Sequence, residues 1–300
     1  LVLGIAFIFL NLFAGEVVLR TKEQHQLTGY AGKYLGRWGK RIMTFTMLFS
    51  IYGALTAYLI GEGETLHAIF KIGEPLWYGL LFFAVAIFII WRGTTETGKA
   101  EFVLMILLFL VVIFISIFSY RNINFNHLTF FDFGKLFLPY GIILFAMMGS
   151  PAIPEMQEVL GKDKLQMKKA IIVGTCIPII LYLVFTFVIM GIVGLDQFEL
   201  LAPNQRIATI ALSVYAHPLL GSCANILAVL SMFTSFLTLG TALAQVYEYD
   251  YALSRSLAML LTFVIPFIIV LFNLTTFNAA LGITGAIAGG LDGIMIMLMY

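Results

Sequence analysis

The stretch PYGIILFAMMGSPAIPEMQEVL at residues 139–160 decides the fold, because it is apolar enough to cross a membrane yet carries helix breakers at its centre. Gly149, Ser150 and Pro151 lie near its middle, and a second proline follows one turn later. Proline lacks an amide donor and clashes with the preceding turn, and the residue before it avoids helical backbone angles. Ser150 is suited to cap a second half-helix that begins at Pro151. The pattern predicts a helix that is split near 147–151, with a simple proline kink as the alternative.

A split helix in the middle of a bilayer leaves main-chain groups without partners, which is tolerated only where they line a cavity. The N-terminal end of the second half-helix carries a partial positive charge that suits a carboxylate. The carbonyl groups at the C-terminal end of the first half-helix suit an ammonium group or a cation. The break therefore offers complementary poles for a zwitterion such as an amino acid.

The composition of the chain indicates an integral membrane protein. Its 300 residues are 61% hydrophobic and 11% charged, whereas a soluble domain has about 25% charged residues. The formal net charge of +1 argues against a nucleic-acid partner, which needs a clustered basic face. Both cysteines, Cys176 and Cys223, lie in apolar runs, and the sequence holds no phosphate-binding loop, nucleophile elbow or zinc signature. We therefore predict no catalytic residue, no metal site, no cofactor and no enzymatic activity.

Nine apolar stretches are candidates for membrane-spanning helices. They lie at 1–19, 42–61, 76–91, 101–119, 137–160, 170–194, 219–246, 254–272 and 278–300. Of the 17 basic residues, 13 lie in the odd-numbered connections between these spans and 4 in the even-numbered ones. The positive-inside rule then places the Leu1 end outside and the Tyr300 end in the cytoplasm.

Two long connections, at 20–41 and 195–218, are five spans apart and therefore lie on opposite faces of the membrane. This arrangement predicts an inverted repeat of five helices; two long loops of unrelated origin are the alternative. In a five-plus-five repeat the partner of the broken span precedes Leu1. We therefore expect a first helix that these 300 residues lack.

Polar residues inside the spans are candidates for ion coupling. The seventh span has hydroxyl groups on one helical face, including that of Ser231, and Thr234 with Ser235 could supply oxygen ligands to Na⁺. Hydroxyl groups in membrane helices also bond to carbonyls of their own helix, which is the alternative for each of them. Asp292 in the ninth span is the best-placed protonatable group, because an ionisable residue inside a membrane is costly and usually functional.

Small residues form faces on two further spans. Ser50 and Ala54 belong to such a face on the second span, where they can pack against the broken helix and shape a pocket. We therefore include both among the candidate substrate-binding residues. The ninth span has a glycine stripe that predicts close helix packing, formed by Gly282, Gly285, Gly289 and Gly293.

Three segments resemble a known family of membrane proteins. GALTAYLIGEGETL (53–66), the core of the 139–160 span and TSFLTLGTAL (234–243) occur in this order. They resemble the amino acid/auxin permeases, above all their aromatic and hydroxy amino-acid permease branch, within the amino acid–polyamine–organocation superfamily. The resemblance implies an all-α, LeuT-like polytopic helix bundle with five-plus-five inverted repeats, forming a single transporter domain over 1–300. Residues 1–119 would supply helices two to five and 134–300 helices six to ten, with the first helix and a last helix missing.

The resemblance also implies which residues hold the substrate. The unwound part of helix six would share the site with the first helix, and here it comprises Met147, Met148, Gly149, Ser150 and Pro151. The hydroxyl stripe of the seventh span falls where sodium-dependent relatives hold a cation. Proton-driven relatives replace that cation by a lysine on helix five, which the span at 101–119 lacks. The coupling ion therefore stays open between H⁺ and Na⁺.

We expect a secondary transporter that moves an amino acid, with aromatic and hydroxy amino acids as first candidates, by ion-coupled symport and alternating access. Its expected location is a bacterial or archaeal cytoplasmic membrane. The expected partners are the substrate and the lipid bilayer, without nucleic acid and without an obligatory protein partner. An amino-acid exchanger and a non-transporting amino-acid sensor of the same fold are the alternatives.

Overall fold

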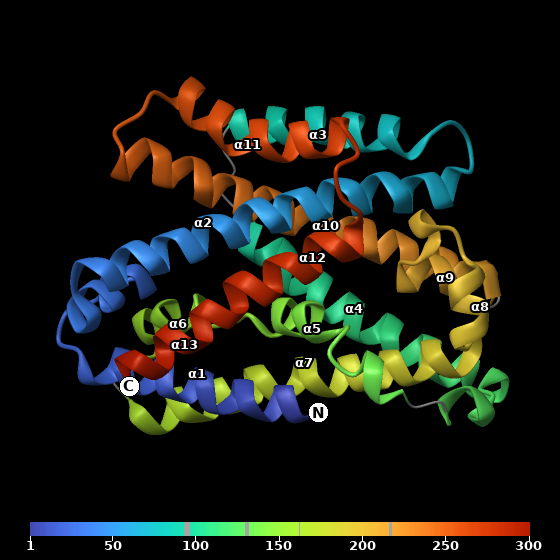
Figure 1. Cartoon of the computed structure of the whole chain (residues 1–300), viewed down its shortest axis with the longest axis horizontal. Coiled ribbons are helices and arrows are strands. Elements are labelled where there is room, and N and C mark those ends of the chain that lie inside the picture. The colour runs from blue at the N-terminus through green and yellow to red at the C-terminus, as the bar shows by residue number, and fades with distance from the viewer. Residues whose placement is uncertain (93–96, 130–131, 162, 216–217) are drawn as a thin grey trace. The chain divides into compact units, whose positions relative to one another are not determined.

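The computed structural model describes residues 1–92, 97–129, 132–161, 163–215 and 218–300, and all regular elements in these ranges are helices (Figure 1). The chain divides into two compact units. Unit 1 comprises Leu1–Ser50, Phe133–Leu183 and Leu281–Tyr300, and unit 2 comprises Ile51–Asp132 and Val184–Ala280. Each unit therefore draws helices from both predicted repeats.

Within the described residues, seven helices are long and apolar enough to cross a membrane. They are α1 (Val2–Arg20), α2 (Leu27–Phe70), α3 (Pro75–Arg92), α4 (Thr97–Ser119), α7 (Lys164–Val193), α10 (Pro218–Gln245) and the run of α12 (Phe277–Thr284), the π-helical turn η6 (Gly285–Gly289) and α13 (Gly290–Met299).

Two of the nine predicted spans take another form. The span at 254–272 is α11 (Arg255–Leu271), an apolar helix of 17 residues. The span at 137–160 contains two short helices, α5 (Tyr140–Met147) and α6 (Ala152–Leu160). All nine stretches contain helix, but the number of membrane crossings remains a prediction.

The two long connections are largely helical, which corrects their description as loops. The helix α2 begins at Leu27 and continues to Phe70, with a kink at Gly36, whose φ is 69°. Its first turns form a helix because Leu27 and Tyr30 pack in the core of unit 1, while the basic residues of this segment are exposed. The second long connection contains the short helices α8 (Leu195–Leu200) and α9 (Ala208–Tyr215). The π-helical turn η5 (Val246–Asp250) extends α10.

The core of unit 1 joins α1, the start of α2, α6, α7 and α13. Val17 and Val18 of α1, Ile153 of α6, Ile171 of α7 and Ile296 of α13 belong to one cluster of buried side chains. The glycines of α1 allow a close approach to α7, since a β-carbon at residue 15 would clash with a side chain of that helix. This packing fixes α6 and α7 in unit 1, and residues 148–151 directly precede α6.

The glycine stripe of the last span is a contact surface for α5, as predicted. A β-carbon at Gly285 would overlap the carbonyl oxygen of Gly141, and a β-carbon at Gly141 would overlap the carbonyl oxygen of Gly282. At Gly289 the closest side chains are Leu144 at 3.1 Å and a methionine of the break. Only glycine permits helix backbones to approach this closely. The first half of the broken helix is therefore fixed against η6 and its neighbours.

The core of unit 2 is rich in aromatic side chains from α3, α10 and α11. The rings of Phe82 and Phe236 lie 4.9 Å apart, those of Phe83 and Phe267 lie 5.3 Å apart, and Phe236 stacks on Phe263 at 5.7 Å between centroids. Such offset and edge-to-face pairs add to the stability that burial of the rings provides.

Contacts within each unit join residues at or beside connections that the charge pattern assigns to the same membrane face. In unit 1, Lys164 at the start of α7 pairs with Glu16 near the end of α1 at 2.9 Å. In unit 2, Arg255 donates to the carbonyl oxygen of Trp91 at 2.8 Å, which joins the third and seventh connections. The amide of Asn124 donates to the carbonyl oxygen of Gly191 at 2.9 Å, which joins the fourth and sixth. These contacts agree with the alternation of faces, and the assignment of one face to the cytoplasm stays a prediction.

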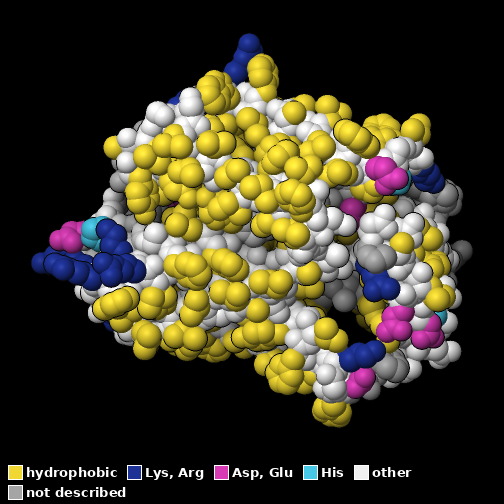
Figure 2. Space-filling view, turned by 45° about the horizontal axis from the view of Figure 1, so that its top comes forward, with side chains coloured by type: hydrophobic (Ala, Val, Ile, Leu, Met, Phe, Trp, Pro, Cys, Tyr) yellow, Lys and Arg dark blue, Asp and Glu magenta, His cyan; other side chains and the backbone are white. Residues whose placement is uncertain are grey.

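Most of the visible surface is apolar. Figure 2 shows hydrophobic side chains over most of one face, with Lys, Arg, Asp and Glu gathered in a few groups. Large exposed side chains include Phe88 of α3, Ile117 of α4 and Leu260 of α11. Soluble proteins rarely expose apolar patches of this extent, whereas a bilayer solvates them.

Candidate functional site

The predicted break in the 139–160 span is present. The helix α5 ends at Met147, and α6 begins at Ala152. Met148 has extended backbone angles, with φ −66° and ψ 93°. The interruption spans the residues 148–151, and its presence confirms a split helix rather than a proline kink.

The break leaves main-chain groups of both signs without helical partners. Pro151 has no amide, and the amide of Ala152 donates to the carbonyl oxygen of Gly149 at 3.1 Å. The carbonyl oxygens of Met147 and Met148 therefore lack their usual donors. Within the described residues, the amides of Gly149 and Ser150 have no backbone acceptor. Carbonyl groups and amide groups without backbone partners thus lie close together at the break between the two half-helices.

The capping prediction for Ser150 and Pro151 is wrong. Pro151 occupies the N-cap position of α6 rather than its first helical position, and no side chain caps this helix. The amides of Ala152 and Ile153 turn back to the carbonyl oxygens of Gly149 and Ser150, both at 3.1 Å, and so they need no side-chain acceptor. The hydroxyl of Ser150 instead donates to the carboxylate of Asp292.

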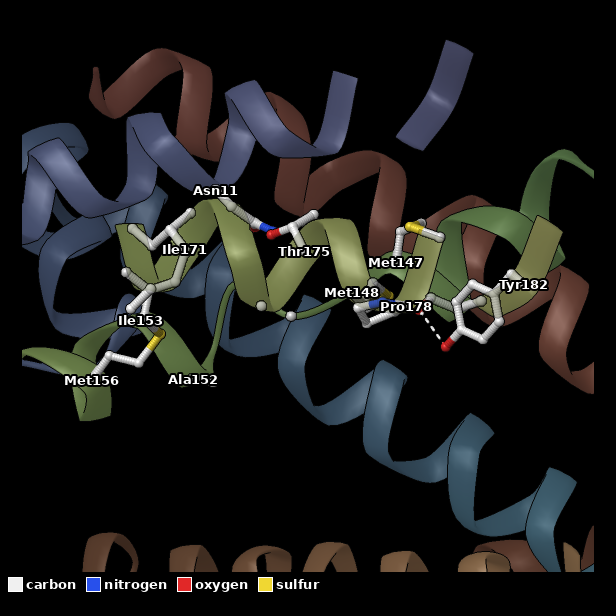
Figure 3. Close-up of a pocket in the computed structure, with 14 residues that line it drawn as sticks. Asn11, Met147, Met148, Ala152, Ile153, Met156, Ile171, Thr175, Pro178 and Tyr182 are labelled. Atoms are coloured by element: carbon white, nitrogen blue, oxygen red, sulfur yellow. Dashed lines mark hydrogen bonds between the residues drawn. The ribbon is translucent and has the colours of Figure 1, made fainter. Parts of the chain in front are cut away.

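A cavity of about 350 Å³ in unit 1 borders the break. Its walls come from α1, the end of α5, the break itself, α6 and α7 (Figure 3). The lining is mainly apolar, with Ile153, Met156 and Ile171 at one end. Small-molecule sites are usually apolar cavities of about 300–1,000 Å³ with a few placed polar groups, and this cavity fits that description.

Three polar side chains line the cavity, and all were missed from the sequence. The amide nitrogen Nδ2 of Asn11 on α1 donates to Oγ1 of Thr175 on α7 at 3.1 Å. Tyr182 on α7 donates to the carbonyl oxygen of Ala146 at 3.3 Å, the dashed line in Figure 3. Asn11 and Glu16 are the polar residues of the first predicted span, and a polar residue inside a membrane helix was the signal available for Asn11. Neither Thr175 nor Tyr182 carries a comparable signal.

The structure divides the predicted substrate residues. Met147, Met148 and Gly149 line the cavity. Ser150 and Pro151 do not, since Ser150 is buried against Asp292 and Pro151 is exposed. Ser50 and Ala54 lie on α2 and are absent from the cavity lining. Their role as substrate residues stays a prediction.

Asp292, a predicted coupling residue, is in contact with the break. It lies in the first turn of α13, directly after the π-helical turn η6, and is 6% exposed. Its hydrogen bond with Ser150 joins residues 142 positions apart in the chain. The structure thus brings together one residue predicted for the substrate site and one predicted for ion coupling.

The hydroxyl stripe lies on α10 in unit 2. Ser231, Thr234 and Ser235 are all partly buried. The hydroxyl of Thr234 donates to the carbonyl oxygens of Leu230 at 3.2 Å and Ser231 at 3.1 Å, which is a common arrangement in membrane helices. Its oxygen lone pairs remain available as ligands, so the cation role of the stripe stays a prediction.

Two glutamates of α2 were also missed, because the predicted second span ended before them. Glu62 is fully buried, and neither of its carboxylate oxygens has a hydrogen-bond partner among the described residues. Glu64 lines a second cavity of about 320 Å³ in unit 2, together with Glu74 and Asn204. The acidic residues in GEGETL at 61–66 were the available signal.

The helix α7, which forms a long wall of the first cavity, begins with a side-chain cap. The Asp163 carboxylate accepts the amides of Leu165 at 2.9 Å and Gln166 at 3.0 Å. The Gln166 side chain donates to the same carboxylate at 2.9 Å. These bonds, with the Gln166 amide as the largest cause, hold the pKa of Asp163 below its ordinary 3.8.

Long apolar helices, a lipid-compatible surface and a broken helix beside a cavity define an integral, multi-pass membrane protein. The sequence model of the tryptophan/tyrosine permease family matches residues 1–300, and the chain belongs to this family.

Two curated relatives agree with this family. The chain is similar to tyrosine-specific transport system 1 of Haemophilus influenzae, with 24% identity over 274 residues that cover 85% of this chain and 67% of the relative. It is also similar to glutamine transporter 2 of Aliivibrio fischeri, with 23% identity over 297 residues that cover 92% and 73%. The family and these relatives support an amino-acid transporter rather than an enzyme. The superfamily and the permease branch expected from the sequence stay predictions.

Proposed function

We propose that the chain is a secondary active amino-acid transporter in which the break between α5 and α6 holds the substrate. The observation that supports this most strongly is the discontinuous helix beside a cavity of about 350 Å³. Discontinuous helices at the binding site recur in secondary transporters, where half-helix ends face the substrate. The substrate carboxylate faces the amide of Gly149, and its ammonium group faces the carbonyl oxygens of Met147 and Met148.

The proposed substrate is an amino acid with a large side chain. The cavity continues from the break along α7 as far as Tyr182 and along α6 as far as Met156. Its apolar lining suits a side chain with a large apolar surface. The matched family is described by tryptophan and tyrosine, and the two relatives by tyrosine and glutamine. Aromatic amino acids and glutamine are therefore the first compounds to test.

The proposed transport is symport with H⁺ or Na⁺ by alternating access. Asp292 supports proton coupling, because a carboxylate only accepts hydrogen bonds, whereas a protonated carboxyl group also donates one. Gain or loss of a proton by Asp292 therefore alters its hydrogen bond with Ser150, which is adjacent to the cavity residue Gly149. The alternative coupling site is the hydroxyl stripe of α10, whose oxygens suit Na⁺.

Transport by the full-length protein in lipid vesicles tests this proposal. Uptake of labelled tyrosine, tryptophan, glutamine and serine is measured with a pH gradient and a Na⁺ gradient imposed separately. We expect accumulation under one gradient. Asp292→Asn is expected to lose accumulation under a pH gradient while it retains counterflow, and Asp163→Asn, which alters an exposed aspartate, serves as the matched control.

The other outcomes separate the alternatives. Uptake that requires preloaded amino acid identifies an exchanger. Binding without uptake or counterflow identifies a sensor. Absence of both binding and transport for every amino acid contradicts the proposal.

A further inference from the structure

We propose that Asn11 and Thr175 form a specificity site that selects amino acids whose side chain ends in a hydrogen-bond donor. The inference rests on the proposed function, and it assigns to these two residues the recognition of the side chain rather than of the zwitterionic head group.

Asn11 lines the cavity and carries a buried acceptor without a hydrogen-bond partner among the described residues. It is 6% exposed, and its Nδ2 donates to Thr175 at 3.1 Å. Its Oδ1 is buried and has no hydrogen-bond partner among the described residues. Both side chains line the cavity, and Figure 3 shows them directed toward one another from α1 and α7.

An unused buried acceptor is costly. Leaving a buried polar group without a partner costs about 1–3 kcal/mol, and the surrounding lipid offers no replacement for water. The Thr175 hydroxyl cannot serve both polar atoms of the amide in one orientation. A donor on a ligand bound in this cavity would satisfy Oδ1.

The same cavity is bordered by the break at Met147–Gly149 and by the Asn11–Thr175 pair. A ligand whose head group binds at the break can therefore bring its side chain to the pair. Side chains with a terminal donor and sufficient length include the phenol of tyrosine, the indole of tryptophan and the carboxamide of glutamine. Phenylalanine and leucine have the apolar surface but lack the donor.

A terminal hydrogen-bond donor is a property shared by the amino acids that appear in the names of the family and its two relatives. Tyrosine, tryptophan and glutamine differ in size, charge distribution and aromaticity, but each ends in an O–H or N–H group. A site built to hydrogen-bond such a group rejects the analogue that lacks it, because the buried partner is then left unsatisfied. We expect wild-type protein to bind tyrosine at least tenfold more tightly than phenylalanine.

Equilibrium binding to the purified full-length protein tests the inference. Tyrosine is compared with phenylalanine, and tryptophan with 1-methyltryptophan, whose indole nitrogen carries a methyl group in place of hydrogen. In Asn11→Leu we expect the tyrosine-to-phenylalanine preference to fall to within about threefold of unity, through weaker binding of tyrosine alone. Thr175→Val, which keeps the shape of the side chain, is expected to reduce the preference in the same direction.

Asn225 provides a matched control. It is 1% exposed on α10, and its Oδ1 also has no partner among the described residues, but it does not line this cavity. Asn225→Leu is therefore expected to keep the full preference for tyrosine. If Asn11→Leu does not purify as a monodisperse protein, Thr175→Val carries the comparison.

Equal binding of tyrosine and phenylalanine by the wild-type protein would overturn the inference, as would a preference that survives both substitutions. Either result leaves the proposed function intact, because amino acids still bind. Failure of the wild-type protein to bind any amino acid would instead contradict the proposed function.

Discussion

Replacing Gly149 by valine tests whether the break is the substrate site, because the structure predicts loss of binding without loss of the fold. The nearest atom to a β-carbon built at Gly149 is the carbonyl oxygen of Met147, 4.0 Å away. The φ angle of Gly149 lies outside the left-handed region that favours glycine. Valine therefore meets neither a steric clash at Cβ nor a left-handed backbone.

The expected effect on binding follows from the position of Gly149 in the cavity lining. Overpacking a well-fitted contact costs about 1–3 kcal/mol. Because 1.4 kcal/mol corresponds to a factor of ten in Kd, the Kd of the bound amino acid should rise about 5- to 150-fold. The free energy of unfolding should change by less than about 0.5 kcal/mol, as it does for substitutions that disturb no packing.

Calorimetric or radioligand binding to the purified full-length protein measures the Kd, and thermal unfolding in detergent measures the stability. Gly290→Val is the matched control, since a β-carbon at Gly290 meets no atom within 4 Å and the residue does not line the cavity. We expect the control to bind like wild type. A Gly149→Val variant with wild-type affinity would refute the placement of the substrate at the break.

Three further substitutions test the packing and the charges. Gly285→Ala should lower the free energy of unfolding by about 1–3 kcal/mol, because its methyl group overlaps the carbonyl oxygen of Gly141. Glu62→Leu should raise it by about 1–3 kcal/mol, because two buried oxygens without partners are removed. Asp163→Ala should lower the unfolding temperature at pH 7, since it removes the cap that accepts the amide of Gln166. The folded-state pKa of Asp163 lies below the ordinary value, so this stabilisation is complete above about pH 4 and is lost as the pH falls through that lower pKa.

Each of these has an outcome that contradicts it. Gly290→Ala controls for the helix propensity of alanine, and equal stability of the two alanine variants would exclude the close approach of α5 to the last helix. A lower unfolding temperature for Glu62→Leu would show that the carboxyl group has a partner. A difference between wild type and Asp163→Ala that is unchanged from pH 7 to pH 3 would show that the cap is not ionised.

The break and the glycine stripe were predictable because both depend on local chemistry. Proline lacks an amide in any environment, so the interruption before Ala152 follows from the residues 149–151 alone. The glycines of the last span recur on one helical face, and a face without side chains permits close packing. In both cases the spacing of residues along the sequence is sufficient to predict the local structure.

The polar contacts of the site were not predictable because they join distant segments. Asn11 and Thr175 are 164 residues apart, and Ser150 and Asp292 are 142 residues apart. No local pattern determines which polar residues of different helices meet. The capping prediction for Ser150 failed for the same reason, since an acceptor on the last helix takes the hydroxyl and the local amides turn to main-chain carbonyls.

The start of α2 shows a second reason why prediction from the sequence failed. Its basic residues resemble a connection, yet they are exposed residues of a kinked helix that also carries Leu27, Tyr30 and Ala31 into the core of unit 1. The charge pattern was interpreted wrongly for secondary structure, and the topology inferred from it stays a prediction. The predicted second span ended at residue 61, whereas α2 continues to Phe70. The prediction therefore left the fully buried Glu62 outside the span.

The last helix explains how a helix of eight residues can remain ordered beside a cavity. An isolated helix as short as α5 is unstable, because nucleation is unfavourable and few hydrogen bonds follow. Here the contacts of Gly141 with Gly282 and Gly285 fix α5, and Asp292 holds Ser150 on the other side of the break. Both contacts come from the run α12–η6–α13, so a shift of this run displaces both sides of the break together. A π-helical turn lies between the two contacts and is a common location for functional adjustment in helices. The geometry of the break therefore depends on the last helix, and this connection is the route by which the proposed protonation of Asp292 would act on the proposed substrate site.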